Sequence, residues 1–159
     1  MVTDQIDLHA MMRVYAEEAV TLAREEFEVA IDYSEMSLSD ADQILVAIHD
    51  ALPKDTGGDF EEDGPLHQWV QELAVIWGAY LGEVLLHYWR GEWTLNVPAD
   101  HAEATAVQIG DVLVYPISKV YQRLTSDQDT GLVIFYEEVR WELSRITGWG
   151  PRVIPAVAG

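Results

Sequence analysis

WGAYLGEV, residues 77–84, lies in the middle of the longest apolar run of the chain. From Leu66 to Tyr88 apolar residues recur at spacings of three and four and cover more than half of a helix circumference. Pro65 suits the first turn of such a helix, and Gly91 suits its end. The pattern predicts a central helix that is buried on most sides.

Three small residues, Ala74, Gly78 and Gly82, recur every four positions along this helix. Each glycine costs roughly 1 kcal/mol of helix propensity, which packing must offset. We therefore expect the backbone of a strand or another helix to approach closely along this stripe. Glu83 lies beside the stripe, where a carboxylate needs a cation or water, and Lys119 is the partner that we expect.

A membrane role is disfavoured by the same segment. Residues 73–89 are too few for a confident span, and they include Glu83 and His87. The first 14 residues, MVTDQIDLHAMMRV, lack the basic start and apolar core of a secretory signal. The chain has no cysteine, which removes disulfides and thiolate chemistry. We expect a cytoplasmic protein.

After Gly91 the apolar period changes from that of a helix to that of a strand. Residues 92–97, EWTLNV, alternate apolar and polar side chains, as a half-buried strand does. Residues 104–109 and 112–116 flank Gly110 and Asp111, a pair that suits a type II′ hairpin. The pattern predicts a three-stranded antiparallel meander.

Further helices are expected on both sides of this region, with the bounds 6–27, 37–52, 117–124 and 132–147. The first helix would bury one stripe: Leu8, Met11, Tyr15, Ala19, Leu22 and Ala23. Ser37 would cap the second helix, and Gly148 would end the last. Residues 28–34, EVAIDYS, alternate and predict a short extended segment.

This order of elements predicts an α+β fold in which long helices pack on one face of a small three-stranded antiparallel meander. The length of 159 residues suits a single domain over 1–159. Residues 54–64, KDTGGDFEEDG, predict an acidic mobile loop, and residues 150–159 predict an irregular C-terminal strap.

The charge balance is the strongest anomaly of the composition. Lys and Arg number 9 against 28 Asp and Glu, for a formal net charge of −19. Such a field repels nucleic acid and anionic membranes, and it attracts basic partners. The simpler explanation is a surface that keeps the protein soluble, or an organism whose proteins are generally acidic.

Metal and catalytic motifs are incomplete. Asp59, Glu61, Asp63 and Gly64 match part of an EF-hand loop, but Val70 stands where the bidentate Glu should be. Glu83 and His87 lie four apart on one helix face, yet no third ligand motif completes a site. The chain also lacks GxSxG, P-loop, GxGxxG and zinc-ribbon motifs. We predict no metal, no cofactor and no catalytic residue.

Five residues remain as candidates for ligand binding: Glu83, Lys119, Arg123, Trp77 and Trp93. Lys119 and Arg123 lie four apart in PISKVYQRL, where both side chains point the same way, and could hold an anionic group. The alternative, which we favour, is that they pair with carboxylates of the protein.

The aromatic residues extend these alternatives. Most of the tryptophans are expected in the core, but Trp141 and Trp149 fit its stripe poorly and predict an exposed aromatic patch.

The motifs WGAYLGEVL, GEW and GD-x4-PISKVYQRL resemble an uncharacterised bacterial domain family. The segment YAEEAVTLAREEFEVAIDYSEMSLSDADQIL is similar to the N-terminal part of that family, so the resemblance covers most of residues 13–140. It implies a bacterial α+β domain and assigns no functional residue. By analogy alone, some small acidic bacterial proteins of comparable build are immunity proteins.

Three functional hypotheses follow. The first is a non-catalytic, acidic protein-binding domain, immunity-like towards a basic toxin. The second is a small-molecule-binding domain or enzyme whose pocket lies between the central helix and the sheet. The third is a scaffold or homodimer that associates through an exposed aromatic patch.

Overall fold

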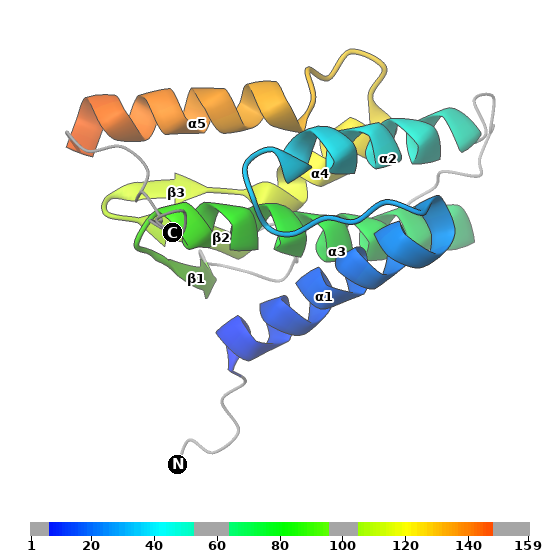
Figure 1. Ribbon diagram of the computed structural model, residues 1–159, viewed down its shortest axis with the longest axis horizontal. Coiled ribbons are helices and arrows are strands. Elements are labelled where there is room, and N and C mark those ends of the chain that lie inside the picture. Colours follow the sequence, from blue (N-terminus) through cyan, green and yellow to red (C-terminus); the bar gives the residue numbers. More distant parts are fainter. Residues whose placement is uncertain (1–6, 53–63, 96–104, 148–159) are drawn as a thin grey trace.

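The computed structural model describes residues 7–52, 64–95 and 105–147. It confirms the predicted α+β class, with helices packed on a three-stranded antiparallel sheet (Figure 1). The elements, in chain order, are α1 (Leu8–Phe27), α2 (Ser37–Ala51), α3 (Pro65–Tyr88), β1 (Glu92–Leu95), β2 (Thr105–Ile109), β3 (Val112–Val114), α4 (Pro116–Thr125) and α5 (Leu132–Thr147).

Several predicted features fall outside the described residues. They are the acidic loop 54–64 apart from Gly64, the helix end at Gly148, the strap 150–159 and Trp149. In the part of the chain that the structure covers, no helix has the length and apolar character needed to cross a membrane.

Helix α3 lies at the centre, with α1 on one side and α4 on the other (Figure 1). Its middle turns are buried all around: Trp77, Gly78, Ala79, Tyr80, Leu81 and Gly82. Pro65 occupies its first turn, as predicted. The helix ends at Tyr88, because Trp89 is already extended, so the prediction that Gly91 ends it was wrong.

The two glycines of α3 allow close contacts with different elements. A Cβ at Gly78 would lie 2.5 Å from the Cα of Ile117, in the first turn of α4. A Cβ at Gly82 would lie 2.2 Å from the indole ring of Trp93, on β1. The expected close approach of a backbone is therefore confirmed at Gly78, whereas at Gly82 the close neighbour is a tryptophan ring.

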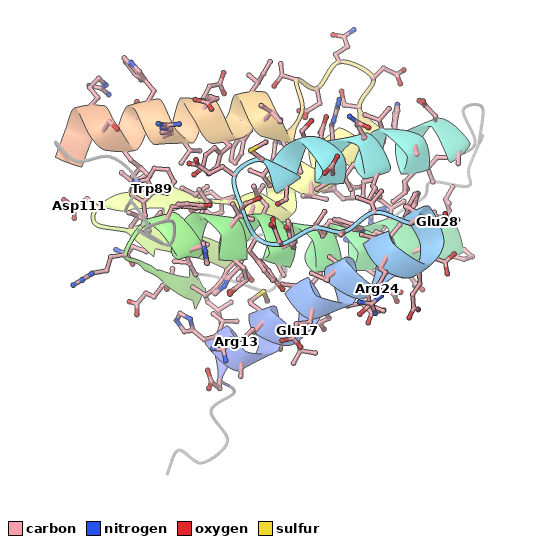
Figure 2. All side chains as sticks on the ribbon, in the orientation of Figure 1. Arg13, Glu17, Arg24, Glu28, Trp89 and Asp111 are labelled. Atoms are coloured by element: carbon pink, nitrogen blue, oxygen red, sulfur yellow. The ribbon has the colours of Figure 1, made fainter. Side chains whose placement is uncertain are left out.

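Helix α1 packs on α3 through a stripe that the prediction matches in its second half, at Ala19 and Ala23, but not at Tyr15. Its buried residues are Met12, Ala16, Ala19 and Ala23. Tyr15 is 36% exposed and does not belong to the core. In the first half of α1 the buried residues are Met12 and Ala16, each one position after the predicted Met11 and Tyr15. Arg13, Glu17 and Arg24 lie on the outer side of α1, away from α3 (Figure 2).

The sheet follows the predicted order, β1-β2-β3. Trp93, Val107 and Val114 are register partners in one row across it, and all three are buried. The hairpin between β2 and β3 turns at Gly110, whose φ of 61° is the positive value that the first position of a type II′ turn requires. Gly91 has another role, since a Cβ there would lie 2.4 Å from the main-chain oxygen of Gln108.

The segment between α1 and α2 alternates in burial without forming a strand. Ile31 is buried, and its neighbours Ala30 and Asp32 are exposed, but the segment joins no ladder. Two tyrosine hydroxyls of α3 accept hydrogen bonds from main-chain N–H groups of the segment. Tyr80 accepts from the N–H of Tyr33 at 2.8 Å, and Tyr88 accepts from that of Glu35 at 3.3 Å.

Ser37 begins α2, but it does not cap the helix with its side chain. Its hydroxyl is buried and shares a hydrogen bond of 2.6 Å with Tyr80. The hydroxyl of Ser34 instead accepts from the main-chain N–H of Ser37, at the start of the helix, at 3.1 Å. On α5, Tyr136 donates a short hydrogen bond to Glu35, so the segment is held from two helices.

We predict that Gly78→Ala lowers the free energy of unfolding by about 1–3 kcal/mol, the usual range for an overpacked core. In an exposed helix the same change would raise it by about 1 kcal/mol. The loss arises because the atom that the new methyl group meets, the Cα of Ile117, is main chain and cannot rotate away. Urea denaturation measures the change.

The matched control is Gly82→Ala in a Trp93→Leu background, where the ring that blocks the methyl group is gone. There the substitution should stabilise, whereas Gly78→Ala should remain destabilising in that background. A neutral or stabilising Gly78→Ala would contradict the close contact between α3 and α4.

Burial makes this segment sensitive to alkali. Burial, helped by the charges of Glu17 and Glu83, raises the pKa of Tyr33 to about 12. An unfolded tyrosine titrates near pH 10, so its contribution to stability is complete below about pH 10 and is lost as pH rises through about 12.

We predict that Tyr33→Phe reduces the fall of unfolding free energy with pH between about 10 and 12, by at most about 1.4 kcal/mol per pH unit. Denaturation at a series of pH values measures this slope. Tyr15→Phe, at an exposed position of α1, provides the comparison. An unchanged slope in Tyr33→Phe would show that Tyr33 does not keep its proton in the folded state.

Candidate binding groove

The structure separates Glu83 from its expected partner. Glu83 is half-buried and accepts a hydrogen bond of 2.8 Å from the indole N–H of Trp93. Lys119 lies against Asp129 instead, so the predicted Glu83–Lys119 pair was wrong. The carboxylate of Glu83 fixes the ring that covers Gly82, which gives both Glu83 and Trp93 a packing role.

Lys119 is nearly buried at the start of α4. Its Nζ lies 2.5 Å from a carboxylate oxygen of Asp129, and the two side chains are only 8% and 13% exposed. The ammonium also lies 5.4 Å from the ring centre of Phe135, a favourable cation–π distance. Asp129 belongs to the turn between α4 and α5, so this pair ties that turn to α4.

Arg123, one helical turn further on, binds α2. Its Nε and an Nη donate to the two carboxylate oxygens of Asp42 at 2.9 and 2.8 Å. These hydrogen bonds raise the pKa of Arg123 further above its usual value. Another Nη donates to the main-chain oxygen of Asp129 at 2.9 Å, and Asp42 also accepts from the main-chain N–H of Leu132 at 2.9 Å.

Lys119 and Arg123 thus point the same way, as predicted, and each meets a carboxylate of the protein. The pairing alternative is the one that the geometry shows. Both positive charges are compensated, so an anionic ligand would have to displace Asp129 or Asp42. Trp77 is also part of the core, at 1% exposure, with its indole N–H unpartnered.

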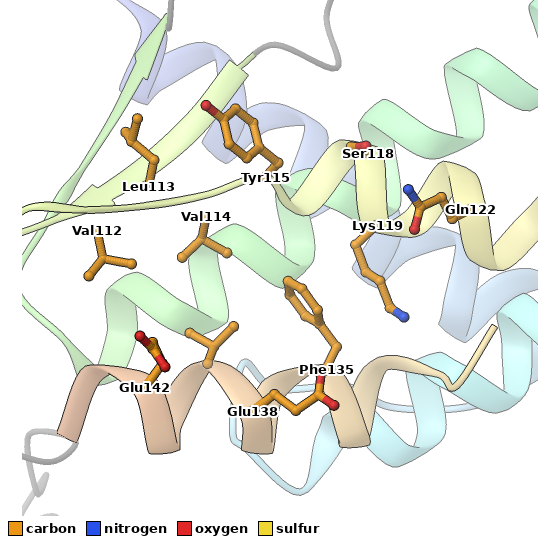
Figure 3. A pocket seen from close by; sticks show the side chains of 11 residues that line it. Val112, Leu113, Val114, Tyr115, Ser118, Lys119, Gln122, Phe135, Glu138 and Glu142 are labelled. Carbon is orange, nitrogen blue, oxygen red and sulfur yellow. The ribbon is translucent and has the colours of Figure 1, made fainter. Parts of the chain in front are cut away.

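A surface groove of about 600 Å³ lies between β3, α4 and α5 (Figure 3). It has no lining residue on α3, unlike the predicted pocket beside the central helix. Helix α5 contacts α2 and α4, and the groove separates its middle from β3. The apolar part of the lining consists of Val112, Leu113, Val114, Tyr115, Phe135 and Val139.

The polar part of the lining has two acidic residues, Glu138 and Glu142, beside the neutral Ser118 and Gln122 and the basic Lys119. Glu138 is exposed and has no bonding partner in the described parts of the chain. Glu142 forms a surface pair with Arg145 at 2.7 Å, of a kind that contributes little to stability. Lys119 is the one cation of the lining, and Asp129 already compensates it. The electrostatics of the groove therefore favour a cationic group.

Exposed apolar side chains continue from the groove over the outside of α5. Ile134 is 49% exposed and Trp141 is 63% exposed. They lie seven residues apart, so they share one helix face, and Glu138 lies between them on that face. The prediction that Trp141 is exposed is confirmed. Arg145 lies over the Trp141 ring, 5.2 Å from its centre.

Sequence reasoning found Lys119 but missed the groove. The available signal was α5 itself, whose residues Phe135, Glu138, Val139 and Glu142 place two apolar and two acidic side chains on adjoining stripes. A helix that is only partly covered has this pattern. Among the described residues no three His, Asp or Glu side chains gather as metal ligands, and most of the partial EF-hand pattern lies outside those residues.

We predict that Asp42→Asn lowers the free energy of unfolding by about 3 kcal/mol, because Arg123 then keeps a largely buried charge without its partner. Urea denaturation measures the loss, and added salt should not restore the stability. Asp111→Asn makes the same change of charge in an exposed turn and serves as the control. Equal effects of the two substitutions would contradict a structural role for the Asp42–Arg123 pair.

Comparison of the chain with protein-family models, with curated proteins and with solved structures gives no significant match. The resemblance to an uncharacterised bacterial family therefore stays a prediction.

Proposed function

We propose that this protein is a non-catalytic binding protein whose groove between β3, α4 and α5 receives a cationic segment of another protein. The observation that carries the proposal is Glu138, an exposed carboxylate that pairs with none of the described residues and lies at the border of an apolar groove. The net charge of −19 adds a long-range field that would speed the encounter with a basic partner.

The apolar lining supplies the short-range part of such an interaction. Phe135 and Val139 are half-buried in the free protein, so a bound side chain would remove the rest of their surface from water. The exposed Trp141 and Ile134 extend this surface beyond the groove, and aromatic residues at such positions often dominate binding energy. An apolar lining with acidic residues at its border suits a segment that carries both apolar and basic side chains.

An immunity protein that neutralises a basic toxin is one biological role of this kind. It requires recognition and no chemistry, which agrees with a chain that lacks the common catalytic motifs. We expect this role in the bacterial cytoplasm, where a chain without cysteine needs no oxidising compartment.

A small molecule is the second candidate for the same groove. The volume of about 600 Å³ is within the usual range for ligand pockets, and the lining combines apolar walls with a few polar groups. Because Lys119 is already paired, such a ligand would be neutral or cationic. An uncharged ligand would bind with little dependence on salt.

The test is titration calorimetry with a capped six-residue peptide of alternating valine and lysine. We expect binding that weakens at least about tenfold when salt is raised from about 20 to 300 mM, since screening removes most of the charge attraction. Glu138→Gln should weaken binding at low salt by about tenfold. Absence of binding at low salt, or binding that salt does not change, would overturn the proposal.

The matched control is Glu18→Gln, which removes one exposed carboxylate from α1, on the far side of α3 from α5. It makes the net charge less negative by the same one unit but leaves the groove intact. Equal loss in the two variants would mean that the peptide responds to the overall field, and the groove would then not be the binding site.

A further inference from the structure

The groove runs along the backbone edge of β3. Successive side chains of a strand point to opposite faces of its sheet. In Figure 3, Val112 and Val114 point towards α5, and Leu113 and Tyr115 point the other way. All four residues nevertheless line the groove. Among the described strands β3 lies at the edge of the sheet, so the main chain of these residues borders the groove on that side.

The pairing of β3 with β2 identifies the backbone groups at this edge. Ile109 and Val112 are register partners on either side of the two-residue turn. In a two-residue hairpin this first pair exchanges both hydrogen bonds, and bonded pairs alternate with non-bonded ones. The next pair, Gln108 and Leu113, is therefore non-bonded. The N–H and C=O of Leu113 point away from β2, towards the edge at which no other described strand pairs with β3.

Helix α5 forms the opposite wall of the groove, and this wall is long enough for a short strand. Its lining residues run from Phe135 to Glu142, a rise of about 10 Å. An extended segment advances about 3.3 Å per residue, so about three of its residues fit along the length of this wall. On this wall Phe135 and Val139 are half-buried, and Glu138 is exposed.

We propose that the partner segment binds as an added strand along the outer edge of β3, with one face of the added strand towards α5. This inference rests on the proposed function and specifies its mode. The main chain of the segment bonds to the N–H and C=O of Leu113. Its apolar side chains contact Phe135 and Val139, and a lysine or arginine reaches Glu138. Strand addition of this kind satisfies the open edge while pockets select side chains.

Charge commits the occupant to a cationic segment. The unpaired group on the wall is a carboxylate, and Lys119 is compensated by Asp129. The rest of the chain has an excess of acidic residues, so a segment from a second copy would on average meet repulsion. A helical segment would instead contact the walls through its side chains and leave the edge of β3 unbonded.

The experiment uses the wild-type protein and N-methylated versions of the valine–lysine peptide. In one version the valines are N-methylated, and in the other the lysines are. Along a strand the N–H groups of alternate residues point to opposite edges, so only one version places methyl groups against β3. We expect one version to lose at least about tenfold in affinity and the other to bind like the unmodified peptide.

Amide hydrogen exchange supplies the second readout. The peptide should slow exchange at Leu113, on the edge that it covers, and leave exchange at Leu95 unchanged, on the opposite edge of the sheet. Salt-dependent binding that neither version alters, or that both abolish, would overturn strand addition and leave the proposed function standing. Absence of binding by the unmodified peptide would overturn both.

Discussion

The close approach of α4 and β1 to α3 is the constraint on which the other contacts depend. Gly78 lets the first turn of α4 lie directly on α3, and Gly82 receives the ring of Trp93. With α4 fixed in this way, Lys119 and Arg123 face the turn before α5 and the side of α2. With Trp93 fixed, the buried row through Val107 and Val114 brings β3 to the edge of the groove. Because Gly78 and Gly82 have no side chain, they determine where the ion pairs and the groove lie.

The scarce cations near this contact are used inside the protein. Lys119 and Arg123 lie in partly buried pairs, where each compensates a carboxylate and helps to hold α2, α4 and the turn before α5 together. Glu138 has no such partner in the described residues and is exposed to solvent at the border of the groove. The acidic composition and the apolar groove both enter the proposed association with a basic partner.

The helices and the hairpin were predictable because their signals are local. The spacing of apolar residues determines each helix, and Gly110 marks the turn. The partners of the cations were not predictable, since Asp129 is 10 residues from Lys119 and Asp42 is 81 residues from Arg123, in a chain with 28 acidic residues. Residues 28–34 alternate like a strand, but tyrosine hydroxyls on α3 accept from the main-chain N–H groups of Tyr33 and of the following Glu35, which no local pattern reveals.

The two ion pairs of α4 differ in the conformational entropy that the unfolded chain loses when each pair forms. Lys119–Asp129 closes a loop of 10 residues, and Arg123–Asp42 closes one of 81. Because loop entropy grows with the logarithm of length, the longer closure costs about 2 kcal/mol more. Lys119–Asp129 can therefore form in a partly folded chain that contains only the C-terminal third. Asp42 lies on α2, so its contacts with Arg123 and Leu132 connect α2 to α4 and to the start of α5.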